Sequence, residues 1–337
     1  MKKILTMTLN PCIDRTVYLE KLQVGETNIV KKVIEEAAGK GINVAIGLQH
    51  LHVPVKAMGF AYKEDVEKLY EKLDAEQIPY AFVEVDGRLR VNQKLFDESK
   101  SEMTECNEKG MPVDKVDVDK LLQLLEKELY DASVLVLSGS VPPGVNKDIY
   151  AVMTSMANEA GVKVILDASG ELLLEGVKAK PYLIKPNREE FVKTFMRSEA
   201  EQEKRSNCPL EKCRGDVQEL SEEQILRAVG QSLANGLSYI CLSLGADGAI
   251  LISRSAYNKM SDGNDNSLVI EKRPAISVPI RSLQGAGDAM VAGLCKAIYD
   301  NEEDKMLDYA LNMAASTIML EGTRMGDKYT DTIDEMQ

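Results

Sequence analysis

Short apolar runs alternate with segments of helical periodicity along most of this chain of 337 residues. Turn residues bound the apolar runs, which are typical of buried strands and occupy residues 3–9, 133–137, 162–166, 182–184 and 239–244. Amphipathic helices are predicted at residues 42–51, 65–77, 118–129, 147–160, 222–235, 289–299 and 305–320. Strands that alternate with helices of this length favour an α/β fold in which a mostly parallel sheet is covered on both faces.

Two parts of the chain follow a period of two instead. Apolar and polar side chains alternate at residues 16–19, 28–36, 81–85 and 89–95, a pattern that indicates strands with one covered face. Four such strands predict a small second sheet, inserted in two pieces at about 12–37 and 80–105 within a single domain of residues 1–337. We expect this sheet to lie as a lid over the ends of the main strands, with an apolar face that a second subunit can cover.

The acidic composition restricts the partners of the chain. A net charge of −13 argues against nucleic acid or an anionic membrane, although a few local cations and amides can still bind a phosphorylated substrate. No apolar stretch approaches the roughly 20 residues of a membrane span. The first apolar run stops at Asn10-Pro11 without a small-residue cleavage site, which favours a buried strand over a signal peptide. With its six cysteines scattered, the chain is typical of a reduced, cytoplasmic protein.

Three local features predict no metal or ligand site. Residues 197–220 are highly charged and poor in large apolar side chains, which predicts a surface insertion or a mobile loop. Cys208 and Cys213 lie in this segment without a histidine. His50 and His52 have no carboxylate or thiol next to them in the sequence, so we interpret them as helix-end residues.

Turn and polar residues follow several of the predicted strands. In a parallel sheet, ligands bind beyond the carboxyl ends of the strands, so these residues should meet at one edge. They are Asn10-Pro11, Ser138-Gly139-Ser140, Asp167, Lys185-Pro186-Asn187 and Gly245. The sequence therefore predicts a ligand site at this edge, beneath the lid.

The stretch SLQGAGDAMVAGL, residues 282–294, places a carboxylate in the first turn of an apolar helix. Asp288 can cap this helix, because Asp accepts hydrogen bonds from the free amides and suits the helix dipole. Alternatively, the amides of the glycine-rich turn hold an anion and Asp288 acts as a base beside it. The turn matches neither the phosphate-binding loop G-x-x-x-x-G-K-[ST] nor a dinucleotide-binding fingerprint.

Other stretches also combine turn residues with polar side chains. AAGKGINVA, residues 37–45, joins glycines, Lys40 and Asn43 at a predicted helix start, a set that suits an anionic or hydroxyl-rich ligand. TLNPCIDRT, residues 8–16, ends a strand and presents Asp14. The remaining stretches are SGSVPPGV (138–145), KPNREE (185–190) and SLGADGA (243–249). Taken singly, each of these stretches is also explained as a turn or a helix cap.

The order and spacing of the motifs resemble those of the ribokinase-like (PfkB) sugar kinases over nearly the full chain. In family order the motifs are TLNP-x-IDRT, AGKGINVA, SGS-x-PPG, KPN-x-x-E, SLGADGA and GAGD-x-x-VAG. The resemblance implies a three-layer α/β sandwich with a small β-sheet lid. It also implies a phosphotransferase that uses ATP and Mg²⁺ and has an alcohol group as acceptor. TLNP-x-IDRT, LRVNQKL and MTECNEKG look like the phosphosugar branch, especially 1-phosphofructokinases, with tagatose-6-phosphate kinases as close relatives.

The resemblance further implies a role for each matching residue. Asp288 would be the general base, and the amides of residues 285–288, from Gly285, Ala286 and Gly287 onward, would form the anion hole for the migrating phosphoryl group. The residues that match the ATP site are Lys185, Asn187, Ser243, Gly245, Asp247, Gly248 and Asn312. Glu190 matches a glutamate that acts on Mg²⁺ through water. The acceptor site is matched by Asp14, Gly39 and Asn43 for hydroxyls, by Lys40 and Arg90 for the phosphate already on the sugar, and by Ser138.

The implied reaction converts fructose 1-phosphate and ATP to fructose 1,6-bisphosphate and ADP. Tagatose 6-phosphate and fructose 6-phosphate are alternative acceptors. A sugar-phosphate-binding regulator without turnover is the non-enzymatic alternative. An NAD-dependent dehydrogenase is a weaker alternative from another class of enzyme. Because relatives cover the lid with that of a partner, the resemblance also implies a homodimer that packs through about residues 15–36 and 80–97.

The chain departs from the family pattern at several positions. Ala38 replaces the first glycine of the usual GGKG, Gln284 stands where Val or Thr is usual, and Ala289 replaces a frequent serine. Residues 59–69, GFAYKEDVEKL, replace a glycine-rich turn that borders the acceptor, and His52 replaces a glycine just upstream. The last two departures concern the identity of the acceptor rather than catalysis.

Overall fold

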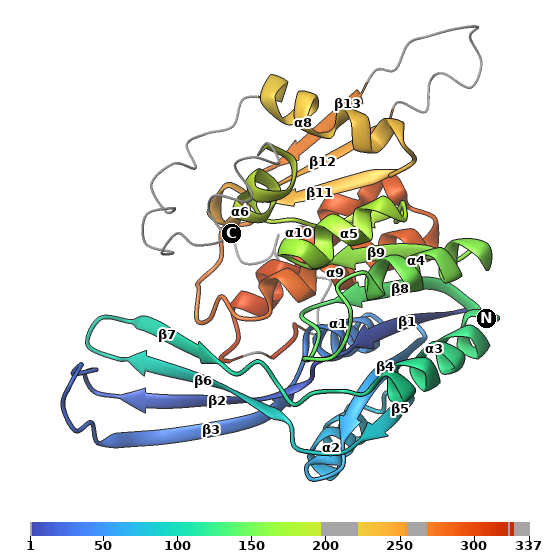
Figure 1. Ribbon diagram of the computed structural model, residues 1–337. Coiled ribbons are helices and arrows are strands. Elements are labelled where there is room, and N and C mark those ends of the chain that lie inside the picture. Colours follow the sequence, from blue (N-terminus) through green and yellow to red (C-terminus); the bar gives the residue numbers. More distant parts are fainter. Residues whose placement is uncertain (1, 197–221, 255–267, 323, 327–337) are drawn as a thin grey trace, which may run out of the picture.

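The structure is a computed structural model that describes residues 2–196, 222–254, 268–322 and 324–326. The predicted insertion at 197–220, with Cys208 and Cys213, lies outside these residues. A nine-stranded sheet forms the centre of the molecule, in the order β13-β12-β11-β10-β9-β8-β1-β4-β5 (Figure 1). Its strands are β1 (Lys3–Thr8), β4 (Val55–Tyr62), β5 (Tyr80–Val85), β8 (Ala132–Ser138), β9 (Lys163–Asp167), β10 (Leu183–Ile184), β11 (Tyr239–Ser243), β12 (Ala249–Arg254) and β13 (Leu268–Arg273). Neighbouring strands from β5 to β11 are parallel, whereas β12 and β13 are added antiparallel, so the predicted mostly parallel sheet is confirmed.

Helices cover both faces of this sheet and complete three layers. The helices on one face are α1 (Lys40–His50), α2 (Val66–Ala75), α9 (Ala286–Asp300) and α10 (Met306–Ile318). Those on the other face are α3 (Lys115–Leu129), α4 (Ile149–Glu159), α5 (Gly170–Lys178), α6 (Arg188–Phe191) and α8 (Glu222–Ala234), with a π-helical turn at Val192–Met196. None of the helices in the described ranges has the length and apolar character of a membrane span.

The packing of α3 shows why the helical periodicity predicts these elements. Leu121, Leu125 and Leu129 are spaced by four, lie on one side of the helix and are buried against the sheet. Burying each such side chain contributes about 1.5–3 kcal/mol to the stability of the fold, and the amphipathic spacing places all three on the face that packs against the sheet. Strands β4, β12 and β13 and helix α5 were not predicted.

A second, four-stranded sheet projects beyond the carboxyl ends of the main strands (Figure 1). Its order is β3-β2-β6-β7, with β2 (Cys12–Leu19), β3 (Val30–Ala38), β6 (Arg90–Asp97) and β7 (Glu102–Asn107). The central pair, β2 and β6, is parallel, and β3 and β7 pair antiparallel on the outside. We call these four strands the lid.

The composition of the lid corrects one prediction. Residues 81–85 do not belong to it, because β5 is the edge strand of the main sheet and pairs with β4. Tyr80 of β5 stacks on Tyr70 of α2, with ring centroids 4.6 Å apart, so a helix covers part of this strand. Alternation indicates a partly covered strand but not the sheet that it joins. The fourth lid strand is β7, which the alternating pattern did not predict.

The departure at residues 59–69 comprises the end of β4, a turn and the start of α2. Gly59 has a φ of +147°, and a Cβ at this position would lie 1.9 Å from the carbonyl oxygen of Thr8, so β4 approaches β1 too closely for a side chain. Tyr62 is fully buried, and its hydroxyl donates to the carbonyl oxygen of Met111 at 2.9 Å. These residues fill the core beside the site described below and are not among those that line its cavity.

Candidate active site

A cavity of about 440 Å³ lies between the lid and the carboxyl ends of β1, β8 and β9. Its lining is mostly polar and comes from both the lid and the three-layer body. The lining residues are Thr8, Asn10, Cys12, Asp14, Gly39, Lys40, Asn43, Arg90, Asn92, Lys94, Glu105, Asn107, Ser138, Gly139, Ser140, Ala168, Ser169, Gly285 and Asp288. The structure thus brings together all six of the predicted acceptor residues, together with Gly285 and Asp288.

Asp288 lies on the wall of this cavity in the first turn of α9. The N-cap of α9 is Gly285, whose φ of 77° is left-handed, and no side chain caps the helix. Asp288 is therefore the third helical residue, which excludes the capping interpretation. Its Oδ2 instead accepts a hydrogen bond of 2.8 Å from Asn43 Nδ2 of α1. Burial raises the pKa of Asp288 to about 6, with a contribution from the neighbouring Asp167, and the Lys40 ammonium and the Asn43 hydrogen bond act in the opposite direction.

Two lysines hold a second buried carboxylate behind Asp288. Asp167, at the end of β9, is 1% exposed and lies 3.0 Å from Lys40 Nζ and 3.1 Å from Lys185 Nζ. Burial alone would raise the pKa of Asp167, but the two ammonium groups outweigh it and keep that pKa below its usual value. The Asp167 carboxylate in turn raises the pKa of Lys40. Asp167 and Lys40 are therefore charged at neutral pH.

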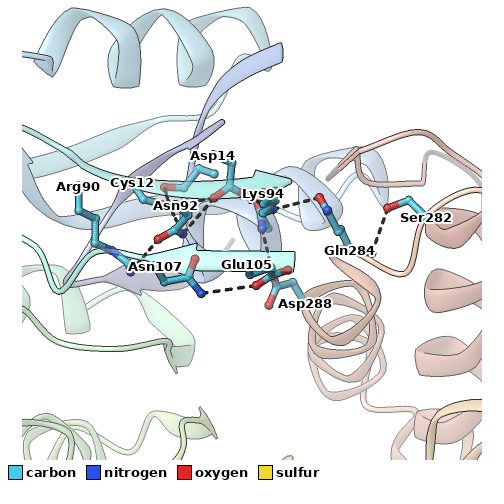
Figure 2. A network of polar contacts seen from close by, with 12 residues as sticks. Cys12, Asp14, Arg90, Asn92, Lys94, Glu105, Asn107, Ser282, Gln284 and Asp288 are labelled. Carbon is cyan, nitrogen blue, oxygen red and sulfur yellow. Dashed lines mark hydrogen bonds and ion pairs between the residues drawn. The ribbon is translucent and has the colours of Figure 1, made fainter. Parts of the chain in front are cut away.

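The lid contributes a network of polar side chains on its inner face (Figure 2). Asp14 on β2 accepts from Asn92 Nδ2 at 3.0 Å and from Lys94 Nζ at 2.7 Å, both on β6. Lys94 Nζ also donates to Gln284 Oε1 at 3.0 Å, in the loop that leads to α9. Arg90, Asn92 and Lys94 alternate along β6, so their side chains share the inner face.

Arg90 differs from the other cations that line the cavity. Its guanidinium donates to the backbone oxygens of Asn10 and Glu108, each at 3.1 Å, and to Asn92 Oδ1 at 3.0 Å. These three acceptors are neutral, whereas Lys40 and Lys94 are paired with carboxylates. Within the described ranges Arg90 forms no ion pair, so its charge is available to an anion in the cavity.

Two buried oxygens beside the cavity lack a partner among the described residues. They are Asn10 Oδ1 and Ser138 Oγ, both on cavity-lining residues. Buried polar atoms are normally hydrogen-bonded, so the two are suited to contact a polar ligand.

Six of the seven residues that match a nucleotide site lie around the ends of β10 and β11, and the seventh, Asn312, lies in α10. Asn187 caps α6 in a capping box, in which its Oδ1 accepts from the Glu190 amide and Glu190 Oε2 accepts from the Asn187 amide, each at 2.9 Å. Ser243 donates its amide to the Pro186 oxygen at 3.0 Å and ends β11 beside this cap. The capping role of Asn187 is thus observed, and it leaves Glu190 Oε1 outside the box.

The turn after β11 approaches β13 closely. A Cβ at Gly248, whose φ is +89°, would lie 2.1 Å from the Arg273 oxygen. Asp247 pairs with Arg188 at 3.1 Å, and both line a cavity of about 460 Å³ between β11, β12, β13 and α8. Gly245 belongs to the same 3₁₀ turn. Asn312 donates to the Asp308 oxygen within α10 and lines neither this cavity nor the one beneath the lid.

Lys185 connects the two groups of residues. A Cβ at Gly287 would lie 3.6 Å from Lys185 Nζ, which also pairs with Asp167. The glycine-rich turn therefore lies between the acceptor cavity and the residues that match a nucleotide site. Phosphoryl transfer requires a donor and an acceptor on either side of a group of anion-binding donors, and this arrangement supplies it.

Sequence reasoning missed several residues of the site. Asn92, Lys94, Glu105 and Asn107 line the cavity from the lid but were not singled out. The alternation of LRVNQKL contains the signal for two of them, because a strand that carries Arg90 toward the cavity carries every second neighbour there as well.

The chain matches a family model described as pfkB family carbohydrate kinase over residues 7–328. The chain belongs to this family. The 1-phosphofructokinase of Vibrio cholerae is 30% identical, with 97% of this chain and 93% of the relative covered. The 1-phosphofructokinase of Haemophilus influenzae is 32% identical, with 87% of this chain and 83% of the relative covered. Among solved structures, phosphofructokinase-2 of Escherichia coli superposes with a TM-score of 0.79 at 24% identity and covers 97% of this chain and 96% of its own.

Family membership confirms the resemblance drawn from the motifs. The chain is a carbohydrate kinase, a phosphotransferase with an alcohol group as acceptor. The superposition also confirms the ribokinase-like α/β fold with its smaller, separate sheet.

Proposed function

We propose that this kinase transfers the γ-phosphoryl group of ATP to the free primary hydroxyl of fructose 1-phosphate, giving fructose 1,6-bisphosphate and ADP. The observation that carries the proposal is the placement of Asp288. It is a buried carboxylate with a pKa raised to about 6, on the wall of a cavity that also contains the Arg90 guanidinium, which has no carboxylate partner among the described residues.

Asp288 supplies the base in this reaction. Its carboxylate takes the proton of the acceptor hydroxyl as the new O–P bond forms and the bond between the γ-phosphorus and its bridging oxygen breaks. A base with a pKa near 6 is ionised at neutral pH yet basic enough to accept the proton in the transition state. The amides at the left-handed turn of Gly285 and at residues 286–288 begin α9, where the helix dipole favours the migrating phosphoryl group.

The other cavity residues bind and orient the acceptor. We assign the phosphate of the substrate to Arg90, because a guanidinium offers several donors in a rigid fork. Lys40 assists it with the donors that remain beside its contact to Asp167. Asp14, Asn43, the backbone of Gly39 and the unpartnered Ser138 Oγ suit the sugar hydroxyls.

ATP binds on the other side of the glycine-rich turn in this proposal. Lys185 lies beside its phosphates, with the side chains and amides of Asn187, Ser243, Gly245, Asp247, Gly248 and Asn312 further along. Mg²⁺ typically keeps several waters and uses one or two carboxylates together with substrate phosphates. Glu190 fits that requirement, because its Oε2 is committed to the capping box and Oε1 is left to hold the ion through water. When bound, Mg²⁺ would neutralise charge on the transferring phosphates.

The choice of acceptor in this proposal rests on the names of the relatives. Two curated relatives at 30% and 32% identity are 1-phosphofructokinases, which supports fructose 1-phosphate. Phosphofructokinase-2 of Escherichia coli has been solved in complex with fructose 6-phosphate, which supports that sugar as one alternative acceptor. Tagatose 6-phosphate, which the motif resemblance implies, is the other alternative.

We also propose that the lid packs against a second copy of the chain. Strand β3 and the connection before it expose apolar side chains, with Ile29 86%, Val30 48% and Val33 42% exposed. Covering them with the lid of a partner would remove this area from water. Of the predicted surface at 15–36 and 80–97, the second range is reduced to β6, because residues 80–85 belong to the main sheet and not to the lid.

An assay that couples ADP release to a spectroscopic readout tests the proposal. The purified chain should turn over fructose 1-phosphate with a higher kcat/KM than fructose 6-phosphate or tagatose 6-phosphate, and turnover should stop when Mg²⁺ is chelated. A preference for either 6-phosphate would reassign the acceptor. Binding of a sugar phosphate without ADP release from any of them would contradict the kinase reaction.

A further inference from the structure

Lys94 is a buried lysine on the inner face of the lid that the reaction above does not use. Its side chain is 7% exposed. An ammonium group is costly to bury unless acceptors surround it. Lys94 Nζ meets this condition through Asp14 Oδ2 at 2.7 Å and Gln284 Oε1 at 3.0 Å (Figure 2).

The two acceptors belong to different parts of the molecule. Asp14 lies on β2 of the lid, whereas Gln284 lies in the body, next to the left-handed Gly285 that begins α9. The loop around Gln284 is itself ordered by a hydrogen bond of 3.2 Å from the Gln284 amide to Ser282 Oγ. One nitrogen atom therefore joins the lid to the turn that we assign as the anion hole.

The same contact joins residues that line two cavities. Lys94 lines the acceptor cavity, whereas Gln284 lines a second cavity of about 450 Å³ farther out along the lid. The outer cavity is bordered by the exposed Lys31 and Arg281, so it faces solvent. The Lys94–Gln284 hydrogen bond therefore connects the lining of the acceptor cavity to that of a solvent-facing one.

The geometry points to the Lys94–Gln284 hydrogen bond as a latch that holds the lid against the anion-hole turn and keeps water from the reacting groups. Lys94 and Gln284 are positioning residues in this role. The inference rests on the proposed function, which assigns the acceptor and the anion hole to this cavity.

The two ends of the latch differ in what else they do. Lys94 also offsets the charge of Asp14, which shares the cavity with Asp288 and with the phosphate of the proposed acceptor. Without the ammonium, Asp14 would repel that phosphate and would keep only the hydrogen bond from Asn92 of the two described on β6. Gln284 has no charge, so its removal should release the lid and leave the electrostatics of acceptor binding in place.

Three variants separate these effects, and a fourth is the control. Gln284→Met keeps the length of the side chain but loses the oxygen acceptor, and Gln284→Glu keeps an acceptor. Lys94→Met removes the ammonium. Lys100→Met is the control, because Lys100 lies in the turn between β6 and β7 and, among the described residues, forms an ion pair only with the exposed Glu102, at 4.0 Å.

We measure kcat, the KM for each substrate, and the ratio of ATP hydrolysed to sugar phosphorylated. Loss of a charge-assisted hydrogen bond corresponds to about tenfold or more in rate. Gln284→Met should lower kcat by this factor and raise the ratio of ATP hydrolysed to sugar phosphorylated. Its acceptor KM should stay within about threefold of wild type. Lys94→Met should show the same losses together with an acceptor KM raised about tenfold or more.

Coupling between the two residues gives a second criterion. The double variant should have a kcat no lower than that of Lys94→Met alone, because each substitution breaks the same bond. Gln284→Glu should retain most of kcat, and Lys100→Met should match wild type in every measurement.

Hydrogen exchange tests the latch without turnover. Amides of β6 should exchange faster in Gln284→Met than in wild type, while the Tm of the two proteins stays the same. Unchanged exchange, or an unchanged kcat and ATP ratio in Gln284→Met, would overturn the latch and leave the proposed function standing. If the wild-type chain turns over no sugar phosphate, the proposed function fails, and the exchange comparison still decides whether the contact holds the lid.

Discussion

Replacement of Asp288 by asparagine separates catalysis from stability, because the structure predicts opposite effects on the two. Asn is nearly isosteric with Asp, and its side-chain oxygen can still accept the 2.8 Å hydrogen bond from Asn43. A carboxamide cannot accept the proton of the acceptor hydroxyl. General-base catalysis contributes about 10²–10⁴ in rate, so kcat should fall by that factor while the KM values for ATP and sugar phosphate stay close to wild type.

The same substitution should stabilise the fold. Burial raises the pKa of Asp288 from 3.8 to about 6, so the ionised carboxylate is disfavoured in the folded state. At about 1.4 kcal/mol per pKa unit, this difference lowers the free energy of unfolding of the wild type by about 3 kcal/mol at neutral pH. Asp288→Asn should regain that amount. Because a raised carboxyl pKa lowers stability as pH rises from about 4 to 6, the advantage of Asp288→Asn should be present above about pH 6 and vanish below about pH 4.

Denaturant titrations at pH 7.5 and pH 4, together with single-turnover kinetics, measure both effects. Asp304→Asn is the control, because it makes the same chemical change at an exposed position and should alter neither quantity. A folded Asp288→Asn protein that keeps more than about a tenth of wild-type kcat, with chemistry shown to limit the rate, would refute the assignment of Asp288 as the base. A variant less stable than wild type at pH 7.5 would refute the reasoning from burial.

Three further predictions follow from the site and the lid. Arg90→Ala should raise the acceptor KM about tenfold to a hundredfold, because a charge-assisted phosphate contact is lost, and should leave the KM for ATP unchanged. Steady-state kinetics with each substrate varied in turn measure both constants, and a change in the KM for ATP instead of the acceptor KM would contradict the assignment. Asn43→Ala removes a hydrogen bond that lowers the pKa of Asp288, so the acidic limb of the pH profile of kcat/KM should move to higher pH. An acidic limb at the wild-type position would contradict the effect of this hydrogen bond on the pKa of Asp288. Val33→Glu places a charge on the apolar face of the lid and should shift the mass measured by light scattering from dimer toward monomer, whereas a monomeric wild type at micromolar concentration would remove the proposed dimer.

Five of the nine strands of the main sheet, β1, β8, β9, β10 and β11, were predictable because they are buried on both faces. β8 and β11 consist mostly of apolar residues for that reason, and such runs are distinctive in a sequence. β5 was assigned to the wrong sheet, because an alternating pattern reports how a strand is covered and not which partner it pairs with.

The chemistry of the site was predictable where a motif fixes the backbone. The GAGD turn left two roles open for Asp288. The structure makes the left-handed Gly285 the helix cap, and the role of base for Asp288 stays a proposal. Lys94 could not be recognised in the same way. A lysine in an alternating strand is normally a solvent-exposed residue, and only the contact with Gln284, 190 residues later, shows that it is buried.

The parallel pairing of β2 with β6 in the lid has a consequence for the order of folding. Cys12 pairs with Arg90, so the contact closes a loop of nearly 80 residues that contains β3, α1, β4, α2 and β5. Closing a flexible loop of that length costs about 4 kcal/mol of chain entropy, whereas a loop shortened by prior formation of β4-α2-β5 costs less. Productive pairing of the lid strands should therefore wait for the edge of the main sheet. A refolding chain would acquire its buried core before it can enclose a substrate.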